Sequence, residues 1–241
     1  MNEGQGGQGG KRVAFFGGSF DPPHLGHLTV ARAACAALAL DTVLFAPVGA
    51  QPLKPQGSSA NFDDRLAMTR LAIEGAPNFD LSLVDAPTPA GTPNYTFETL
   101  LRLRAELPGG ALYCLMGADS FLQLRHWRRA AEIPFVAPLI VASRPGQPLD
   151  DLKAVLPTGL TMEPSPGPPP ASSTMEVRSY LLASPAGDRA PFYLLPGLHI
   201  EISASEIRDQ IRDQVRSAAT AGHDLLPVPV SDYIRSHGLY R

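Results

Sequence analysis

Short apolar runs and longer amphipathic runs alternate along most of the chain from Lys11 onward. Runs of strand length bounded by turn residues predict β-strands, and apolar residues that recur every three or four positions predict helices. The predicted strands cover residues 12–17, 42–47, 81–84, 111–116 and 135–142, and the predicted helices cover residues 25–40, 62–74 and 96–107. Strands that alternate with helices indicate βαβ units, so we expect an α/β fold with a doubly wound parallel sheet.

The pattern weakens between residues 147 and 190. Residues 163–173 read Glu-Pro-Ser-Pro-Gly-Pro-Pro-Pro-Ala-Ser-Ser, and proline lacks the N–H that a helix or a central strand needs. We therefore expect a proline-rich insertion over residues 147–190 that forms a surface loop. Beyond it, the sequence predicts a strand at 192–195 or 199–202 and C-terminal helices at 205–215 and 231–237. Residues 1–10 are rich in glycine and are expected to form a disordered tail, which leaves one domain over residues 11–241.

The composition narrows the class of protein. The chain has 241 residues, of which 44% are hydrophobic and 18% charged, as in ordinary globular proteins. Its net charge of −3 argues against a nucleic-acid or membrane-surface partner, because such binders normally carry a basic excess. Cys35 and Cys114 lack the spacing of a zinc site or a redox pair, so we expect buried free thiols. No apolar run has transmembrane length, and we expect a cytoplasmic location.

The first predicted strand runs into the segment Gly-Gly-Ser-Phe-Asp-Pro-Pro-His-Leu-Gly-His at residues 17–27. Gly17 and Gly18 lack β-carbons, which lets the chain turn tightly and lets a ligand approach the backbone. His24 and His27 are three residues apart where a helix begins, so their imidazoles lie on one face. A helix N-terminus binds anions through its unpaired N–H groups. Because the glycine fingerprint of dinucleotide sites and the Walker sequence are both absent at this turn, we interpret it as a phosphate site built with imidazoles.

A second candidate anion site lies at residues 202–208, which read Ile-Ser-Ala-Ser-Glu-Ile-Arg. The spacing of Ser203 and Glu206 predicts a capping box that starts a helix, with Ser205 and Arg208 near the same N-terminus. The simplest interpretation is an ordinary cap beside a solvated arginine. The alternative is that two helix N-termini face each other across a cleft and hold a triphosphate between them.

The two segments together resemble the paired motifs of the nucleotidylyltransferase superfamily, the His-x-Gly-His adenylyl- and cytidylyltransferases. Further segments resemble bacterial nicotinate-nucleotide adenylyltransferases: Pro-Asn-Tyr-Thr at 93–96, Met-Gly-Ala-Asp-Ser at 116–120 followed by Trp127, Ser-Arg-Pro-Gly at 143–146, and the ending from 225 to 241. The resemblance implies transfer of AMP from ATP to nicotinate mononucleotide, giving deamido-NAD and pyrophosphate. It also implies a Rossmann-like sheet of strand order 3-2-1-4-5 with C-terminal helices.

The resemblance implies a role for each matching residue. The expected catalytic residues are His24, His27 and Arg208. The expected ATP-binding residues are Gly17, Gly18, Ser19, Phe20, Gly26, Gly117, Asp119, Arg144, Ser203 and Ser205. The expected residues for nicotinate mononucleotide are Lys54, Tyr95, Thr96 and Trp127. We expect Mg²⁺ to arrive with ATP and expect no metal site made by the protein alone.

Alternatives remain open at this point. The acceptor could instead be nicotinamide mononucleotide, phosphopantetheine or FMN, and the chain could be a non-catalytic nucleotide-binding module. Trp127 could be a half-buried anchor between helices, since tryptophan often plays that part. Leu53 stands where relatives often have histidine, and Lys54 can keep a phosphate contact there. The sequence leaves the oligomeric state open, a homo-oligomer included.

Overall fold

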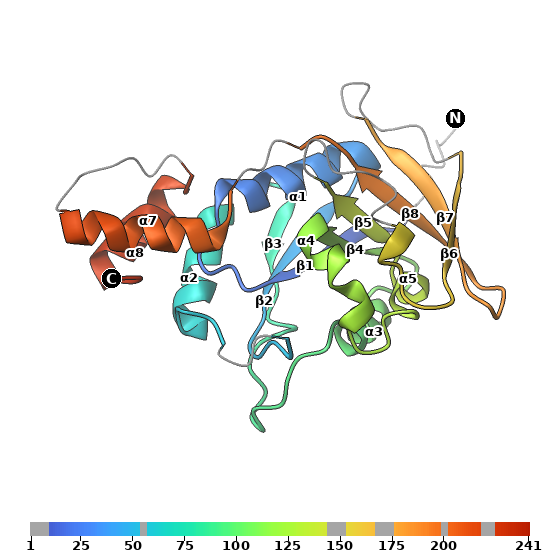
Figure 1. The fold of residues 1–241 in the computed structure, drawn as a ribbon, viewed down its shortest axis with the longest axis horizontal. Coiled ribbons are helices and arrows are strands. Elements are labelled where there is room, and N and C mark those ends of the chain that lie inside the picture. Colours follow the sequence, from blue (N-terminus) through green and yellow to red (C-terminus); the bar gives the residue numbers. More distant parts are fainter. Residues whose placement is uncertain (1–9, 54–56, 144–152, 167–175, 199–201, 218–224) are drawn as a thin grey trace, which may run out of the picture.

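The computed structural model describes residues 10–53, 57–143, 153–166, 176–198, 202–217 and 225–241 (Figure 1). A single twisted sheet runs through the molecule, with helices on both of its faces. The predicted tail falls almost wholly outside the described residues, as do Lys54 and Arg144. No helix among the described segments combines the length and the apolar character that crossing a membrane requires.

The strands form one sheet of order β3-β2-β1-β4-β5-β8-β7-β6. Their bounds are Arg12–Gly18 (β1), Thr42–Pro47 (β2), Phe79–Leu81 (β3), Ala111–Gly117 (β4), Leu139–Ala142 (β5), Thr161–Pro164 (β6), Arg178–Ala183 (β7) and Arg189–Leu195 (β8). Neighbouring strands are parallel from β3 through β8, and β7 and β6 continue the sheet antiparallel. The predicted α/β fold and the order 3-2-1-4-5 are therefore confirmed, with three further strands added at one side.

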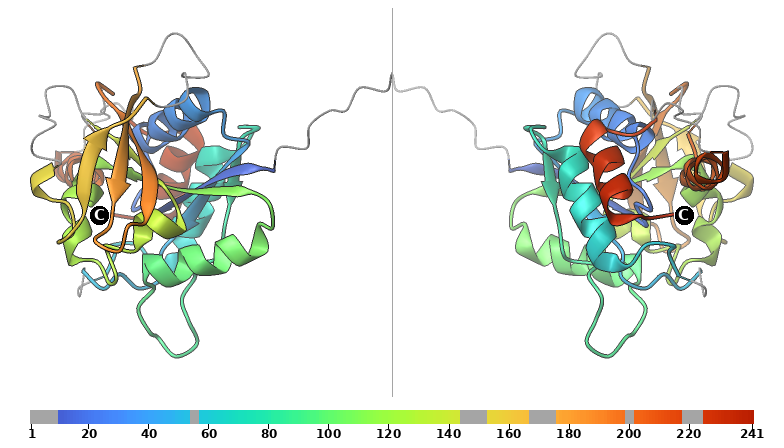
Figure 2. Two further views of the ribbon diagram at one scale, coloured as in Figure 1. Left: turned by 90° about the vertical axis from the view of Figure 1, so that its right-hand side faces the viewer. Right: turned by 90° about the vertical axis from the view of Figure 1, so that its left-hand side faces the viewer.

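Helices cover the two faces of the sheet unequally. Their bounds are Leu25–Leu38 (α1), Phe62–Ile73 (α2), Thr96–Glu106 (α3), Ala118–Leu122 (α4), Ile133–Val136 (α5), Ala204–Ser217 (α7) and Val228–His237 (α8), with a 3₁₀ turn at Leu124–His126 (η1). One apolar cluster joins the sheet to α1, α2, α7 and α8, and a second joins the other face to α3, α4 and α5. Phe15 and Phe16 enter different clusters because neighbouring strand residues point to opposite faces. Helices α2 and α8 lie side by side (Figure 2).

Two predicted strands have different bounds in the structure. The third strand is Phe79–Leu81 rather than 81–84, and Leu83 is exposed beyond it. Only Leu139–Ala142 of the predicted strand 135–142 is extended, because Ile133–Val136 forms the short helix α5. Pro134 lies in the first turn of that helix, where a fixed φ and a missing N–H are tolerated. A short apolar run cannot by itself distinguish a buried strand from a buried helical turn.

The interpretation of residues 147–190 as a surface loop was wrong for the part that the structure describes. This part contains β6 and β7, and β8 begins at Arg189. The β6 strand ends at Pro164 on the edge of the sheet, where a missing N–H costs no interstrand bond. Most of the proline run lies outside the described residues. The predicted strand at 192–195 is confirmed within β8, and both C-terminal helices are present, α8 beginning earlier, at Val228.

Candidate active site

The two predicted nucleotide-binding segments follow neighbouring parallel strands. Val13 of β1 pairs with Leu112 of β4, and the strands end at Gly18 and Gly117, on the same edge of the sheet. The next helix on the β1 side, α1, and the next on the β4 side, α4, cover opposite faces. In doubly wound sheets a ligand crevice opens at the carboxyl ends of strands whose connections diverge in this way. The topology therefore places residues 17–27 and 117–119 at the same edge of the sheet, where such a crevice is expected.

The glycines of the first loop are required by neighbouring aromatic rings. A β-carbon on Gly17 would come 2.6 Å from the ring of Phe15, and one on Gly18 would come 3.2 Å from the ring of Phe20. Phe20 itself has a positive φ of 47° and is buried, with its ring centroid 5.6 Å from that of Phe45. The loop therefore turns over its own core side chain, and this packing sets the path of the backbone toward His24.

The rings of His24 and His27 lie against each other at the start of α1, with their planes tilted by 31°. Their ring centroids are 3.7 Å apart, and the backbone N–H of His24 donates to Nδ1 of His27 at 3.2 Å. Because Nδ1 of His27 accepts, the proton of the neutral ring is on Nε2, which remains a donor. Burial lowers the pKa of His24 to about 4. Burial also lowers the pKa of His27 well below its usual value, and the charge of a protonated His24 lowers it further.

Arg208 connects the segment of residues 202–208 to the segment of residues 17–27. Its Nη1 donates to the carbonyl oxygen of Asp21 at 2.7 Å, and its Nη2 donates to Oγ of Ser205 at 3.2 Å. The N-terminus of α7 therefore lies beside the loop that leads to α1. Oγ of Ser203 accepts from the backbone N–H of Ser205 at 3.2 Å, so Ser203 caps α7 through the second helical residue, not through Glu206 as the predicted capping box requires. The interpretation of Arg208 as merely solvated is wrong.

Two buried residues support the same loop and were missed in the sequence. Nη1 of Arg65 donates to the carbonyl oxygen of Ser19 at 2.6 Å, and its Nη2 donates to that of Val48 at 2.8 Å. The carboxylate of Asp21 accepts from the backbone N–H of Ser59 at 2.6 Å. Arg65 is only 2% exposed, and burial lowers its pKa while the charge of Asp21 acts in the opposite direction. An arginine amid polar positions of α2 carries no local signal of this role.

The end of β4 leaves open space. A β-carbon on Gly117 would meet no atom within 4 Å, and Gly117 is the residue that precedes α4. Asp119, in the first turn of α4, is exposed. On the neighbouring strand, Ser143 is buried and its backbone pairs with Leu195. The openness at Gly117 fits a ligand that approaches the backbone closely.

Three of the four predicted acceptor residues, Tyr95, Thr96 and Trp127, lie at or near the start of α3, and Lys54 lies outside the described residues. Tyr95 precedes this helix and Thr96 is its first residue. The guanidinium carbon of Arg128 lies 4.8 Å from the ring centroid of Tyr95, which brings the Trp127 segment beside Tyr95. Trp127 is half-buried, so that part of its side chain packs against the second apolar cluster and part faces outward.

Asn94 connects this region to the loop after β2, and the sequence did not single out its side chain. Its Oδ1 accepts from the backbone N–H of Ala50 at 3.2 Å, and its Nδ2 donates to the carbonyl oxygen of Ala86 at 3.2 Å. Gln51, the next residue of the loop, accepts from Oγ of Ser19 at 3.2 Å. The predicted phosphate loop, residues 17–24, and the predicted acceptor region are thus linked through residues 50 and 51.

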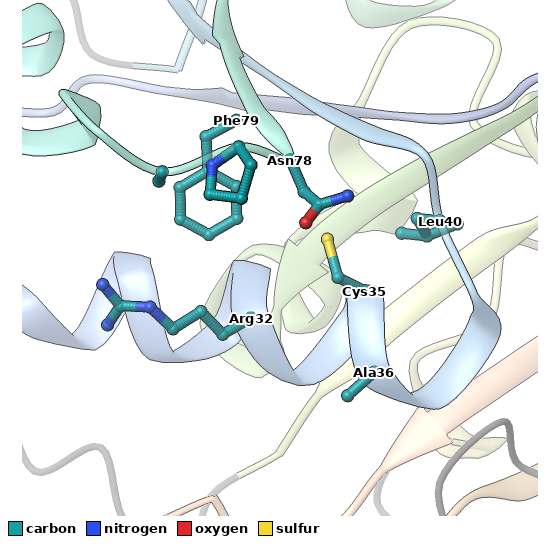
Figure 3. Close-up of a pocket in the computed structure, with 8 residues that line it drawn as sticks. Arg32, Cys35, Ala36, Leu40, Asn78 and Phe79 are labelled. Carbon is teal, nitrogen blue, oxygen red and sulfur yellow. The ribbon is translucent and has the colours of Figure 1, made fainter.

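Other features lie away from this crevice. A surface pocket lined by Arg32, Cys35 and Phe79 opens between α1 and the start of β3, at the amino ends of the strands (Figure 3). Both thiols are free, as predicted, but only Cys114 is buried, and the prediction of burial was wrong for Cys35, which is partly exposed. Burial raises the pKa of Cys35 to about 11 and that of Cys114 to about 12. Within the described ranges, no three histidine, cysteine or acidic side chains cluster as metal ligands.

The sheet order and the two helix N-termini joined by Arg208 define a nucleotide-binding α/β protein. The cytidylyltransferase-like family model matches residues 15–210. A protein of Pelobacter propionicus named "Probable nicotinate-nucleotide adenylyltransferase" is 36% identical over 231 residues, which cover 95% of this chain and 98% of that protein. A Bordetella petrii protein of the same name is 38% identical, and the match covers 96% of this chain and 100% of that protein. The chain belongs to the cytidylyltransferase-like family and, within it, to the nicotinate-nucleotide adenylyltransferases.

Solved structures agree on the fold. The nicotinic acid mononucleotide adenylyltransferase of Plasmodium falciparum, complexed with APC, superposes with a TM-score of 0.64 at 16% identity, over 95% of this chain and 97% of that one. A Vibrio parahaemolyticus protein described as "a Putative Nicotinate-nucleotide Adenylyltransferase" superposes with a TM-score of 0.59 at 16% identity, over 96% of each chain. At this level of identity the likeness supports the Rossmann-like architecture.

Proposed function

We propose that this enzyme transfers AMP from ATP to nicotinate mononucleotide, releasing pyrophosphate and forming deamido-NAD. The observation that carries the proposal is the contact between Arg208 and Asp21, which brings two helix N-termini and two imidazoles to one crevice. Relatives at 36% and 38% identity that carry the name of this activity support the choice of reaction.

The acceptor supplies its own nucleophile. The phosphate monoester of a mononucleotide has a second pKa near ~6, so it is ionised at neutral pH without a protein base. One of its oxygens attacks the α-phosphorus of ATP in line. The bond from that phosphorus to the oxygen that bridges it to the β-phosphorus breaks, and this oxygen leaves with pyrophosphate. The protein then has to position the two phosphates and stabilise the charge that develops on the leaving group.

The groups around residues 17–27 suit that task. The neutral imidazoles of His24 and His27 offer N–H donors, and Arg208 offers a positive charge held by the carbonyl oxygen of Asp21 in the same loop. Donors held in place before the reaction lower the barrier because they need no reorganisation. We assign His24, His27 and Arg208 to the triphosphate, together with Ser203 and Ser205 at the N-terminus of α7.

We assign the remaining ATP contacts to two loops. The backbone of residues 17–20 and Gly26 would line the phosphates, while Gly117 and Asp119 would contact the adenosine in the open space after β4. Arg144 would contribute to the same nucleotide. Mg²⁺ would arrive with ATP, be held chiefly by its phosphates and neutralise part of their charge.

The acceptor would lie between α3 and Trp127. The backbone N–H groups at Tyr95 and Thr96 open a helix, and a helix N-terminus favours a carboxylate over a neutral amide. Trp127 would stack on the pyridine ring, and Lys54 would contact the acceptor phosphate. These assignments together favour nicotinate over nicotinamide.

The test is a pyrophosphate-release assay with ATP, Mg²⁺ and each candidate acceptor in turn. We expect release with nicotinate mononucleotide and much lower kcat/KM with nicotinamide mononucleotide, phosphopantetheine or FMN, and we expect deamido-NAD as the second product. Equal kcat/KM for the acid and the amide would contradict the acceptor assignment. ATP binding without pyrophosphate release from any acceptor would instead indicate a nucleotide-binding module.

A further inference from the structure

The penultimate residue of the chain reaches the phosphate loop. The hydroxyl of Tyr240 donates to Oδ1 of Asp21 at 2.7 Å, a contact between residues 219 positions apart in the sequence. Tyr240 is 9% exposed, and its ring belongs to the apolar cluster of α1, α2, α7 and α8. Its side chain therefore approaches the loop from the protein interior.

The carboxylate of Asp21 receives three donors at this point. It accepts from the backbone N–H groups of Ser59 at 2.6 Å and Ala60 at 3.0 Å, in addition to the hydroxyl of Tyr240. A carboxylate has about four lone-pair sites, so three close donors leave it little freedom to rotate. The backbone carbonyl of the same residue holds Arg208. The orientation of Asp21 thus sets the position of Arg208 and the approach of the chain to His24.

The hydroxyl of Tyr240 remains a donor under all ordinary conditions. Burial raises its pKa, and the charge of Asp21 raises it further, so the phenol does not ionise at neutral pH. A buried hydrogen bond to a charged acceptor is stronger than one between neutral groups. This hydrogen bond can therefore hold Asp21 in a fixed position relative to Tyr240.

We propose that Tyr240 is a positioning residue, which acts through Asp21 to hold Arg208 and the His24 loop in the geometry needed for AMP transfer. This inference rests on the proposed function for its kinetic consequence and on the hydrogen bonds alone for its structural one. A shift of the loop by about 1 Å can lower the rate of AMP transfer as much as about 10²-fold, since the donors no longer meet the developing charge.

The chain provides a matched control. The hydroxyl of Tyr233 donates to Oδ1 of Asp64 at 2.9 Å, which joins α8 to α2 without touching the phosphate loop. Tyr240→Phe and Tyr233→Phe each remove one tyrosine–aspartate hydrogen bond and leave the ring in place. They differ in whether the lost bond reaches Asp21.

Two measurements test the proposal. In steady-state kinetics, we expect Tyr240→Phe to lower kcat about 10-fold while KM for nicotinate mononucleotide stays within twofold, and we expect Tyr233→Phe to keep parental values. In hydrogen–deuterium exchange without substrate, we expect faster exchange of peptides covering residues 17–25 and 58–61 in Tyr240→Phe only. Thermal unfolding of both variants shows whether each remains folded.

The outcomes separate the two proposals. If the parent transfers no AMP, the proposed function fails, and the exchange data alone decide whether Tyr240 holds the loop. If the parent is active and both variants lose kcat equally, or neither loses it, the positioning role is overturned. Unchanged exchange of residues 17–25 in Tyr240→Phe overturns it as well.

Discussion

Nη1 of Arg208 lies 2.7 Å from the carbonyl oxygen of Asp21, although 187 positions separate the two residues in the chain. The contact places a cation from the first turns of α7 beside the loop that carries His24. Under the proposed function, this contact also explains why the motifs at residues 17–27 and 202–208 occur together, because a triphosphate would need both helix N-termini. The predictions below follow from this arrangement.

Replacing Arg208 by lysine should strongly reduce activity. A lysine has one ammonium group and cannot keep the planar pair of contacts to Asp21 and Ser205 while facing a phosphate. We expect Arg208→Lys to lower kcat/KM for ATP by about 10²-fold. Arg212→Lys is the matched control, because Arg212 lies one turn later on α7 and pairs with the exposed Asp209. Equal effects of the two substitutions would refute the specific role of Arg208.

Removing the imidazole of His24 should abolish most turnover and leave the fold intact. Loss of one fixed donor to a transition state costs ~10²–10³ in rate. We expect His24→Ala to lose that much in kcat, with thermal unfolding that remains cooperative. His237→Ala serves as control, since His237 is exposed at the end of α8. Near-normal turnover by His24→Ala would contradict the assignment.

The buried imidazoles make stability depend on pH in a defined window. The pKa of His24 falls from 6.5 to about 4 on folding, so between these values the unfolded chain binds a proton that the folded chain does not. Stability therefore decreases as pH falls from 6.5 toward 4, and is unaffected by this group above 6.5. One pKa unit corresponds to about 1.4 kcal/mol, so His24 accounts for a loss of about 2 kcal/mol by pH 5.

Urea unfolding of the substrate-free protein measures this loss. The carboxylates that titrate nearby are common to the parent and His24→Gln, so their contributions largely cancel when the two proteins are compared at each pH. We expect the unfolding free energy of the parent to fall more steeply than that of His24→Gln between pH 6.5 and 5. Parallel curves would show that His24 is not desolvated in the folded state.

Truncating Trp127 should affect the acceptor and not ATP. Stacking of a base on an aromatic side chain contributes about 1–3 kcal/mol, so Trp127→Ala should raise KM for nicotinate mononucleotide at least 5-fold, and Trp127→Phe should raise it less. KM for ATP should stay near its parental value in both variants. A lower melting temperature with equal changes for both substrates would identify Trp127 as an anchor between helices instead.

Local signals were sufficient for the sheet centre and the first motif. The alternation of apolar strands and amphipathic helices predicted the α/β class and the succession of β1 to β5 along the chain, because strand and helix periodicities are properties of neighbouring residues. The sheet order 3-2-1-4-5, implied by the family resemblance, is confirmed. The residues from Gly17 to His27 were recognisable for the same reason, since a turn, a helix start and an i, i+3 pair are all local. The prediction failed at Ile133–Val136, where a short apolar run fits either a helical turn or a strand.

The sequence by itself determined the class of fold, the phosphate-binding turn after β1 and the residue types that suit nucleotidyl transfer. Only the tertiary structure decided what holds that turn in place. Arg65 donates a hydrogen bond to Ser19 across 46 positions of chain. Tyr240 donates one to Asp21 across 219 positions. Such bonds depend on where the sheet and the C-terminal helices bring the backbone, and no local periodicity encodes them.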